Sequence, residues 1–250
     1  MPPETPQPQP SGHDAGPAAR APVAALAPTV FVAARNEADR IGATLASLAE
    51  AFPGAELIVA DDASTDATAE VAAATGALVV SGRRSLGKGG NMTRAVAWQV
   101  ERLTALGAPP TLLCDGDLGD SAAELRALVD AVADGTCDLA IAAFRRRIGG
   151  GVGAALRYAS WSIRRRSGYE AGAPISGQRA LSPVALNAAF PFAAGYGMEI
   201  GITVDVVRAG LTVRELELDL VHRATGKTLG GFVHRARQLR DFTRVHASRR

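Results

Sequence analysis

The sequence predicts an α/β protein built on an open, mainly parallel sheet that is flanked by helices. One observation is the alternation of short apolar runs with amphipathic helical segments between residues 29 and 144. The other is that Asp, Asn, Lys and Gly residues directly follow several of these apolar runs. The carboxyl ends of parallel strands share one edge of a sheet, and ligands bind at that edge.

The predicted elements follow one another in a regular order. Apolar runs predict strands at residues 29–34, 56–60, 77–80, 111–114 and 138–144. Helical spacing of apolar residues predicts helices at residues 37–52, 66–75, 88–106 and 121–133. After residue 149 the pattern changes to a basic helix, a segment at 176–181, a helix at 197–209, a strand at 212–218 and a basic C-terminal helix.

Composition limits the domain organisation and the class of partner. Residues 1–27 are rich in Pro, Ala and Gly and predict a disordered tail, while residues 28–250 predict a single domain. A formal net charge of +2 gives no overall field that favours nucleic acid. Arginine runs at 145–147 and 164–166 indicate either an anionic partner or a solvated basic surface.

Cysteine content and hydropathy predict a cytoplasmic protein. Cys114 and Cys137 cannot form a disulfide framework and lie in no CxxC pair. No signal peptide is recognisable, and no apolar stretch approaches the roughly 20 residues of a membrane-spanning helix. The sequence leaves open whether the protein contacts a membrane surface peripherally and whether it forms a homodimer.

The first two predicted strands end in polar residues that suit a nucleoside. Ala34 lets a flat ring approach, and Arg35 and Glu37 follow it. Asp61 and Asp62 follow the second strand, where a carboxylate can accept from a base or from ribose hydroxyls. The alternative for the first segment is an ordinary helix start with Asn36 as its cap.

A glycine-rich segment that contains Lys88 suits a diphosphate. Glycines at residues 87, 89 and 90 permit close approach of the backbone, and Lys88 can neutralise phosphate charge. Residues 82–89 nearly match the phosphate-binding loop of ATPases and kinases. Gly89 occupies the position that should be Ser or Thr, which argues against that class.

The fourth predicted strand ends in Asp115, Gly116 and Asp117. Two carboxylates at this spacing can share a Mg²⁺ or Mn²⁺ ion, because both cations prefer oxygen ligands and keep positions for phosphates. An Asp-Gly turn without a ligand is the common alternative. The order of the preceding polar segments favours the metal site.

Three further residues are candidates in the second half. Glu199 lies near the predicted start of a helix, where it could hold an acceptor hydroxyl, act as a base, or only favour the helix dipole. His222 offers a nitrogen ligand to a metal and Arg223 a clamp for phosphate. A structural role is the alternative for His222.

The order of these segments resembles the GT-A fold of family 2 glycosyltransferases, and more closely the glucosyl-3-phosphoglycerate synthase group. The resemblance covers residues 29–244 and rests on ARNE, DDASTDAT, GKGGN, DGD, ISGQRAL, PFAAGYGMEIG and LDLVHR. It implies that residues 28–145 bind a nucleotide-sugar and that residues 146–250 face the acceptor. It also implies a hexosyltransferase that uses Mg²⁺ or Mn²⁺, a UDP-sugar and an anionic acceptor.

The resemblance implies a role for individual residues. The nucleoside would meet Ala34, Arg35, Glu37 and Asp62, and the diphosphate would meet Lys88. Asp117, the direct ligand that the resemblance favours, would share the metal with Asp115 and His222, and Arg223 would share the phosphate charge. Tyr196 and Glu199 would face the donor sugar. Glu199 would be the base if the reaction inverts and would only position the sugar if it retains. The acceptor side would include Ser176, Gly177, Arg179, Arg235 and Arg237.

Departures from the pattern leave other functions open. Gln178 stands where the synthase group has an acidic residue, and Arg179 looks more like the polyprenyl-phosphate sugar transferases. The acceptor is therefore either a phosphoglycerate-type molecule or a polyprenyl phosphate. A nucleotidyltransferase is an alternative, although the turn after the first strand has no glycine. A non-catalytic nucleotide-sugar-binding module is another.

Overall fold

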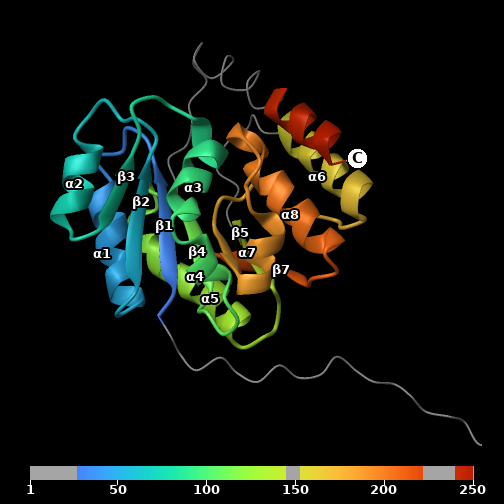
Figure 1. The fold of residues 1–250 in the computed structure, drawn as a ribbon, viewed down its shortest axis with the longest axis horizontal. Helices are drawn as coiled ribbons and strands as arrows, with labels where there is room; N and C mark the ends of the chain where they lie inside the picture. The colour runs from blue at the N-terminus through green and yellow to red at the C-terminus, as the bar shows by residue number, and fades with distance from the viewer. Residues whose placement is uncertain (1–26, 145–152, 222–239, 250) are drawn as a thin grey trace, which may run out of the picture.

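The computed structural model describes residues 27–144, 153–221 and 240–249. These residues form a seven-stranded sheet of order β3-β2-β1-β4-β6-β5-β7 (Figure 1). The strands are β1 (Thr29–Ala34), β2 (Glu56–Asp61), β3 (Leu78–Ser81), β4 (Thr111–Asp115), β5 (Leu139–Phe144), β6 (Arg179–Leu181) and β7 (Val213–Leu218). β6 is antiparallel to β4 and β5, and the other neighbouring strands pair in parallel. The predicted α/β class with a mainly parallel sheet is confirmed.

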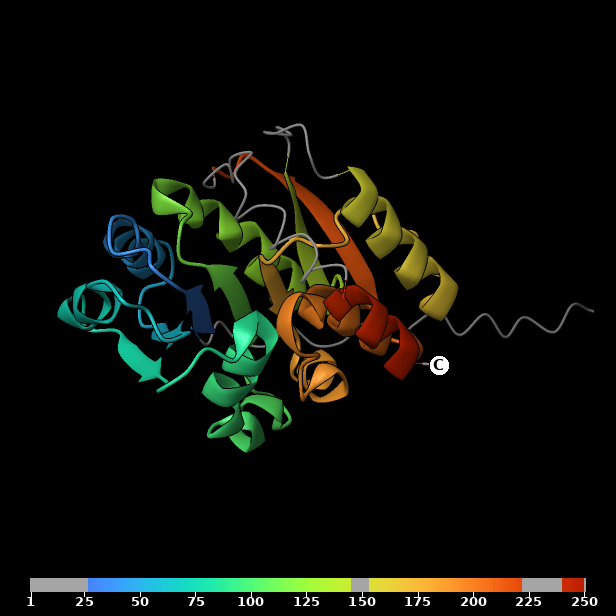
Figure 2. The same cartoon turned by 90° about the horizontal axis from the view of Figure 1, so that it is seen from above.

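Helices cover both faces of the sheet, as the view from above shows (Figure 2). The α-helices are α1 (Ile41–Ala51), α2 (Thr68–Ala74), α3 (Gly87–Ala97), α4 (Val100–Thr104), α5 (Arg126–Ala133), α6 (Gly153–Ser167), α7 (Pro183–Ala189) and α8 (Met198–Arg208). Short 3₁₀ helices η1 (Gly119–Leu125) and η2 (Gly195–Gly197) precede α5 and α8. A C-terminal helix spans residues 240–248.

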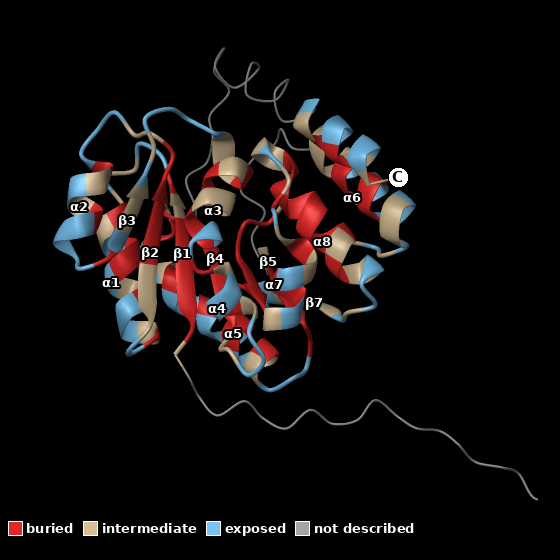
Figure 3. Ribbon diagram, in the orientation of Figure 1, coloured by how far each residue is buried: buried red, intermediate tan, exposed pale blue. Residues whose placement is uncertain are grey.

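Side-chain alternation along the strands divides the core into two layers. Val30 and Val32 of β1 pack with α1, α2 and α5 on one face. Phe31, between them, packs with α3, α4, α7 and α8 on the other face. Successive strand residues point to opposite faces, so a strand that is covered on both sides is apolar throughout. β1 is accordingly almost wholly buried (Figure 3).

Several predicted boundaries were wrong because local contacts override helical spacing. The helix predicted at 88–106 is two helices, α3 and α4. They separate at Gln99, whose backbone leaves helical geometry (φ −121°, ψ 3°) and whose side chain bonds Glu56 Oε1 at 3.2 Å. The helix predicted at 121–133 begins as the 3₁₀ helix η1. Residues 176–181, to which the sequence assigned neither helix nor strand, contain β6 from Arg179 onward.

The helix predicted from Glu37 begins at Ile41, and Asn36 is not its cap. Asn36 has a left-handed backbone (φ 55°), and its Oδ1 accepts a hydrogen bond from Thr65 N at 2.8 Å. The Glu37 N–H donates to Thr68 Oγ1 at 2.8 Å. These bonds connect the segment after β1 to the segment after β2 and keep residues 35–40 outside the helix. The interpretation of Asn36 as an ordinary helix cap was therefore wrong.

Other predictions fall outside the described residues, namely the tail at 1–27 apart from Ala27 and the side chains of His222, Arg223, Arg235 and Arg237. Every helix within the described ranges falls short of the length and apolar character needed to cross a membrane.

Candidate active site

Three neighbouring strands bring the predicted site residues to one edge of the sheet. Ala34 at the end of β1 is in register with Asp61 of β2, and Ala33 is in register with Asp115 of β4. Because these strands are parallel, the polar residues that follow them gather at the same carboxyl edge.

The side chains of Lys88, Asp115, Gln178 and Glu199 form the group that we call the Lys88 cluster. Lys88 Nζ lies 2.6 Å from Asp115 Oδ1 and 3.0 Å from Glu199 Oε1. Gln178 Nε2 donates to Asp115 Oδ2 at 3.1 Å. The Glu199 side chain is only 7% exposed. Burial alone lowers the pKa of Lys88, but Asp115 and Glu199 outweigh burial and raise that pKa above its usual range, so Lys88 is an ammonium ion.

Glycines allow the chain segments around the Lys88 cluster to approach one another closely. An added Cβ at Gly177 would lie 2.5 Å from Asp115 Oδ2 and closer still to Lys88 Nζ. An added Cβ at Gly89 would overlap the Ala193 carbonyl oxygen, so α3 can approach residues 193–195 only with glycine at this position. Gly87, which begins α3, has a left-handed backbone (φ 72°).

Glu37, Gly116 and Asp117 lie beside the Lys88 cluster. An added Cβ at Gly116 would lie 2.5 Å from Glu37 Oε2. Within the described part of the chain, this buried carboxylate oxygen has no hydrogen-bond partner. Burial, helped by Asp117 and Asp115, raises the pKa of Glu37 to about 8. Such a concentration of carboxylates, with one buried oxygen unsatisfied, fits a site that binds a cation.

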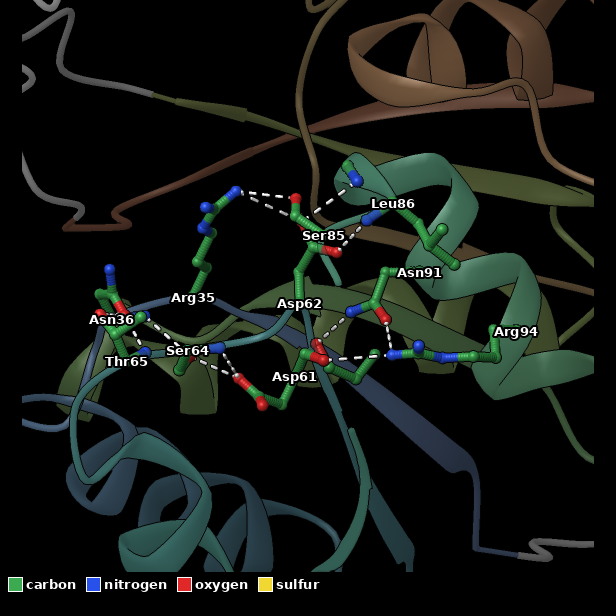
Figure 4. Close-up of polar contacts among 12 residues, drawn as sticks. Arg35, Asn36, Asp61, Asp62, Ser64, Thr65, Ser85, Leu86, Asn91 and Arg94 are labelled. Atoms are coloured by element: carbon green, nitrogen blue, oxygen red, sulfur yellow. Dashed lines mark hydrogen bonds and ion pairs between the residues drawn. The ribbon is translucent and has the colours of Figure 1, made fainter. Parts of the chain in front are cut away.

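The side chains of Asp62, Ser85 and Arg35 form, with the Leu86 and Gly87 backbone, the group that we call the Asp62 cluster (Figure 4). Asp62 Oδ1 accepts from Leu86 N at 2.7 Å, and Asp62 Oδ2 accepts from Ser85 Oγ at 2.6 Å and Gly87 N at 3.1 Å. Arg35 Nη1 donates to Ser85 Oγ at 2.8 Å and lies 3.7 Å from Asp62 Oδ2. Asp62 therefore holds the turn that leads directly into Lys88. Its predicted contact with a nucleoside stays a prediction.

Tyr196 joins the site to the C-terminal helix. Its backbone N–H donates to Asp241 Oδ2 at 3.3 Å. Burial, with Asp241 and Glu199, raises the pKa of the Tyr196 phenol, while Arg35 and Lys88 act in the opposite direction. The phenol thus lies within electrostatic range of both clusters. Nothing in the sequence had indicated Asp241, because its contact joins residues that lie 45 positions apart in the chain.

The predicted acceptor-side position of Arg179 was wrong. Its side chain is fully buried and donates to Ser176 O at 2.7 Å and to Thr203 Oγ1 at 2.8 Å. Residues 178 and 179 point to opposite faces of the sheet, so Gln178 reaches Asp115 and Arg179 enters the core. Gly177 does lie at the Lys88 cluster. Ser176 is nearly buried, and its hydroxyl has no partner among the described residues.

The predicted metal site is only partly covered by the structure. No group of three or more His, Cys, Asp and Glu side chains with metal-binding geometry occurs among the described residues. Asp115 and Asp117 lie at the site, whereas His222 and Arg223 lie outside the described residues. The described residues thus offer a carboxylate pair but not the complete ligand set.

Solved structures of one enzyme share this fold. Glucosyl-3-phosphoglycerate synthase from Mycobacterium tuberculosis in complex with Mn²⁺, UDP-glucose and glycerol 3-phosphate is 27% identical, with a TM-score of 0.71. The match covers 89% of this chain and 79% of that chain. The complex of that enzyme with Mn²⁺, UDP and glucosyl-3-phosphoglycerate is 28% identical, with the same coverage and a TM-score of 0.71. Its complex with Mg²⁺ and UDP is 27% identical over the same shares of both chains, with a TM-score of 0.70.

No curated protein matches the chain significantly in sequence. The family model described as Glycosyl transferase family 2 matches residues 29–194. The resemblance to this family and to the glucosyl-3-phosphoglycerate synthase group is confirmed. The chain therefore belongs to glycosyltransferase family 2 and is a glycosyltransferase with the GT-A fold.

Proposed function

We propose that this chain transfers a hexose from a UDP-sugar to a phosphorylated acceptor, with Mn²⁺ or Mg²⁺ bound. The observation that carries the proposal is the Lys88 cluster. A partly buried ammonium ion lies between Asp115 and Glu199 at the carboxyl edge of the sheet. Structures of similar fold contain UDP-glucose with Mn²⁺, or UDP with Mg²⁺, which supports this choice of donor and cation.

Lys88 binds the diphosphate of the donor in this proposal. Its ammonium group pairs with a carboxylate on each side. A diphosphate also carries negatively charged oxygens, so it can pair with the same ammonium group. As the glycosidic bond breaks, negative charge grows on the leaving UDP. A fixed ammonium group stabilises that charge without reorganisation.

Asp117, with Asp115, supplies the carboxylates for the cation. Both oxygens of Asp115 bond Lys88 or Gln178, and the family resemblance gives Asp117 as the direct ligand. His222 is the proposed nitrogen ligand and Arg223 the proposed partner of the phosphates. A bound divalent cation stabilises the charge of the leaving diphosphate.

Glu199 orients the lysine and the sugar rather than acting as a base. Its Oε1 lies 3.0 Å from Lys88 Nζ, and its side chain is almost buried. Proton transfer to Glu199 would leave Lys88 with one fewer charged partner in a buried site, which is costly. The sequence left two roles open for Glu199, a base or a residue that positions the sugar, and the geometry favours the second. In this proposal Tyr196 lies on the same side of the sugar.

The proposed acceptor is a phosphoglycerate-type molecule. Structures of similar fold were solved with phosphoglyceric acid and with glucosyl-3-phosphoglycerate, and this supports a small phosphorylated acid over a polyprenyl phosphate. Gly177 places its backbone against the Lys88 cluster, so residues 175–177 lie where an acceptor would approach the sugar.

The test incubates the full-length chain with Mn²⁺, one nucleotide-sugar and one acceptor, and identifies products by mass spectrometry. UDP-glucose, GDP-mannose and ADP-glucose are compared, each with 3-phosphoglycerate and with a short-chain polyprenyl phosphate. We expect glycosylated phosphoglycerate and free UDP from UDP-glucose. A product with polyprenyl phosphate alone would overturn the acceptor. Binding of UDP-glucose without turnover of any pair would indicate a non-catalytic module.

A further inference from the structure

A pair of helices forms the outer layer at one end of the molecule. α6 and the C-terminal helix lie side by side beyond α8, at the end of the sheet opposite β3 (Figures 1 and 2). Buried Ile163 of α6 and Phe242 of the C-terminal helix pack with Ile200 and Val204 of α8 in a separate apolar cluster. The inner faces of both helices are therefore held, and their outer faces are exposed.

The outer face of α6 is basic. Arg157, Trp161, Arg164 and Arg165 are exposed, and their spacing places them on one side of the helix. No acidic residue occurs in residues 153–167. On the C-terminal helix, Arg240 and Arg244 are exposed, whereas Asp241 points toward Tyr196 and is mostly covered.

Trp161 is a large apolar side chain within this basic face, and it is 51% exposed. Its ring stacks on His246 at a centroid distance of 4.7 Å and lies 5.4 Å from the Tyr158 ring. The indole is therefore held in place while half of its surface meets solvent. An exposed tryptophan among arginines is the combination that binds the interface between lipid headgroups and acyl chains.

The same residues border a surface hollow of about 890 Å³. Its lining residues are Ser160, Trp161, Arg164, Arg165, Glu170, Ala171 and Gly172. Glu170 is the acidic residue of this set, and it lies 3.6 Å from Arg164. The hollow can admit a phosphate-bearing headgroup between the arginines and the indole.

We propose that the outer face of α6, with the adjoining C-terminal helix, docks on a membrane surface that is rich in anionic phospholipid. Charge complementarity favours this occupant, because arginines attract an anionic leaflet and the indole can enter it. A second copy of this chain is disfavoured, since a symmetric contact would place arginine against arginine. Single-stranded nucleic acid is disfavoured because His246 already covers one face of the indole on which a base would stack.

The docking surface is joined to the active site through the C-terminal helix. Asp241 Oδ2 accepts from Tyr196 N at 3.3 Å, and Gly197 lies so close to Val245 that an added Cβ would overlap it. Docking therefore holds the segment that leads into Glu199 in a fixed position relative to the membrane. The proposal does not depend on the sugar or the acceptor.

The test measures co-sedimentation of the full-length chain with vesicles of phosphatidylcholine alone and with vesicles containing equal parts of phosphatidylglycerol. We expect binding to the anionic vesicles only, weakened by salt. Arg164→Gln/Arg165→Gln should lower the partition coefficient about 25-fold, at roughly fivefold for each arginine. Trp161→Ala should lower it several-fold. The matched control, Arg83→Gln/Arg84→Gln, removes the same charge from the exposed loop after β3 and should bind like wild type.

Four results would overturn the proposal. The first is no binding to anionic vesicles at low salt, and the second is an equal loss in the Arg83/Arg84 control. The third is a wild-type dimer, measured by light scattering, that Trp161→Ala converts to a monomer, because the face would then belong to a second copy. Stronger binding to a single-stranded oligonucleotide than to the vesicles would also count against it. Thermal melts of each variant identify any that fail to fold.

Discussion

The Lys88 cluster and the Asp62 cluster lie at the same edge of the sheet but are held by different forces. The Lys88 cluster is made of ion pairs between side chains at residues 88, 115 and 199, and it is largely buried. The Asp62 cluster is a turn fixed by hydrogen bonds to a single carboxylate, and Arg35 beside it is 55% exposed. A buried charge that loses its partner costs far more than a lost hydrogen bond. Charge balance thus controls the first cluster, and loop geometry controls the second.

The largest effect is expected from Lys88→Met. The substitution leaves Asp115 and Glu199 without the cation between them and removes the charge that meets the diphosphate. We expect kcat/KM to fall by about a thousandfold, measured as UDP release from UDP-glucose. Arg126→Met, which removes an exposed arginine paired with Asp130, is the matched control and should keep wild-type activity. A Lys88→Met enzyme with more than a tenth of wild-type kcat/KM would refute the role of the cluster.

A smaller effect is expected from Gly177→Ala, which adds no charge and removes none. The new methyl group would overlap Lys88 Nζ and lie 2.5 Å from Asp115 Oδ2, so it should push the pair apart. A displacement of about 1 Å at reacting groups can cost about 100-fold in rate, and we expect a loss of that order in kcat. Gly42→Ala is the control, because its methyl group would make ordinary contact with Val71 at 3.4 Å. Equal activities of the two variants would contradict the packing described here.

The smallest effect is expected from Asp62→Asn. The amide keeps the shape of the carboxylate but offers one acceptor oxygen, so the turn at residues 85–87 should loosen. Since each hydrogen bond contributes about 1 kcal/mol, KM for the donor should rise roughly fivefold with little change in kcat. Asp134→Asn, at an exposed carboxylate after α5, serves as the control. A fall in kcat as large as that of Gly177→Ala would mean that Asp62 acts on the reacting groups, and the contrast between the clusters would fail.

Much of the site was predictable from the sequence because parallel strands fix where their ends lie. The apolar runs gave β1, β2 and β4, and their carboxyl ends necessarily brought Asp62 and Asp115 to one edge with Lys88. The second half was less predictable. β6 enters the sheet antiparallel between β4 and β5, and no local pattern specifies that direction.

Side-chain orientation explains the remaining error at the site. Gln178 and Arg179 are adjacent, and a strand sends adjacent side chains to opposite faces. Without knowing the register of β6, the sequence could not tell which of them reaches Asp115, and Arg179 was assigned to the wrong face. Its guanidinium instead bonds Thr203 Oγ1, whose hydroxyl donates to Glu199 O at 3.0 Å.

The most direct test of the central claim is calorimetric titration of UDP into the full-length chain, with Mn²⁺ and with a chelator. The proposed function predicts binding that requires Mn²⁺ and that weakens at least tenfold in Asp117→Asn, of the order seen when groups that hold or orient a metal are changed. Asp134→Asn should bind like wild type, since that carboxylate is remote from the carboxyl edge of the sheet. Equal affinity for UDP with and without Mn²⁺, or in Asp117→Asn and wild type, would contradict a metal-dependent diphosphate site at Lys88 and Asp117.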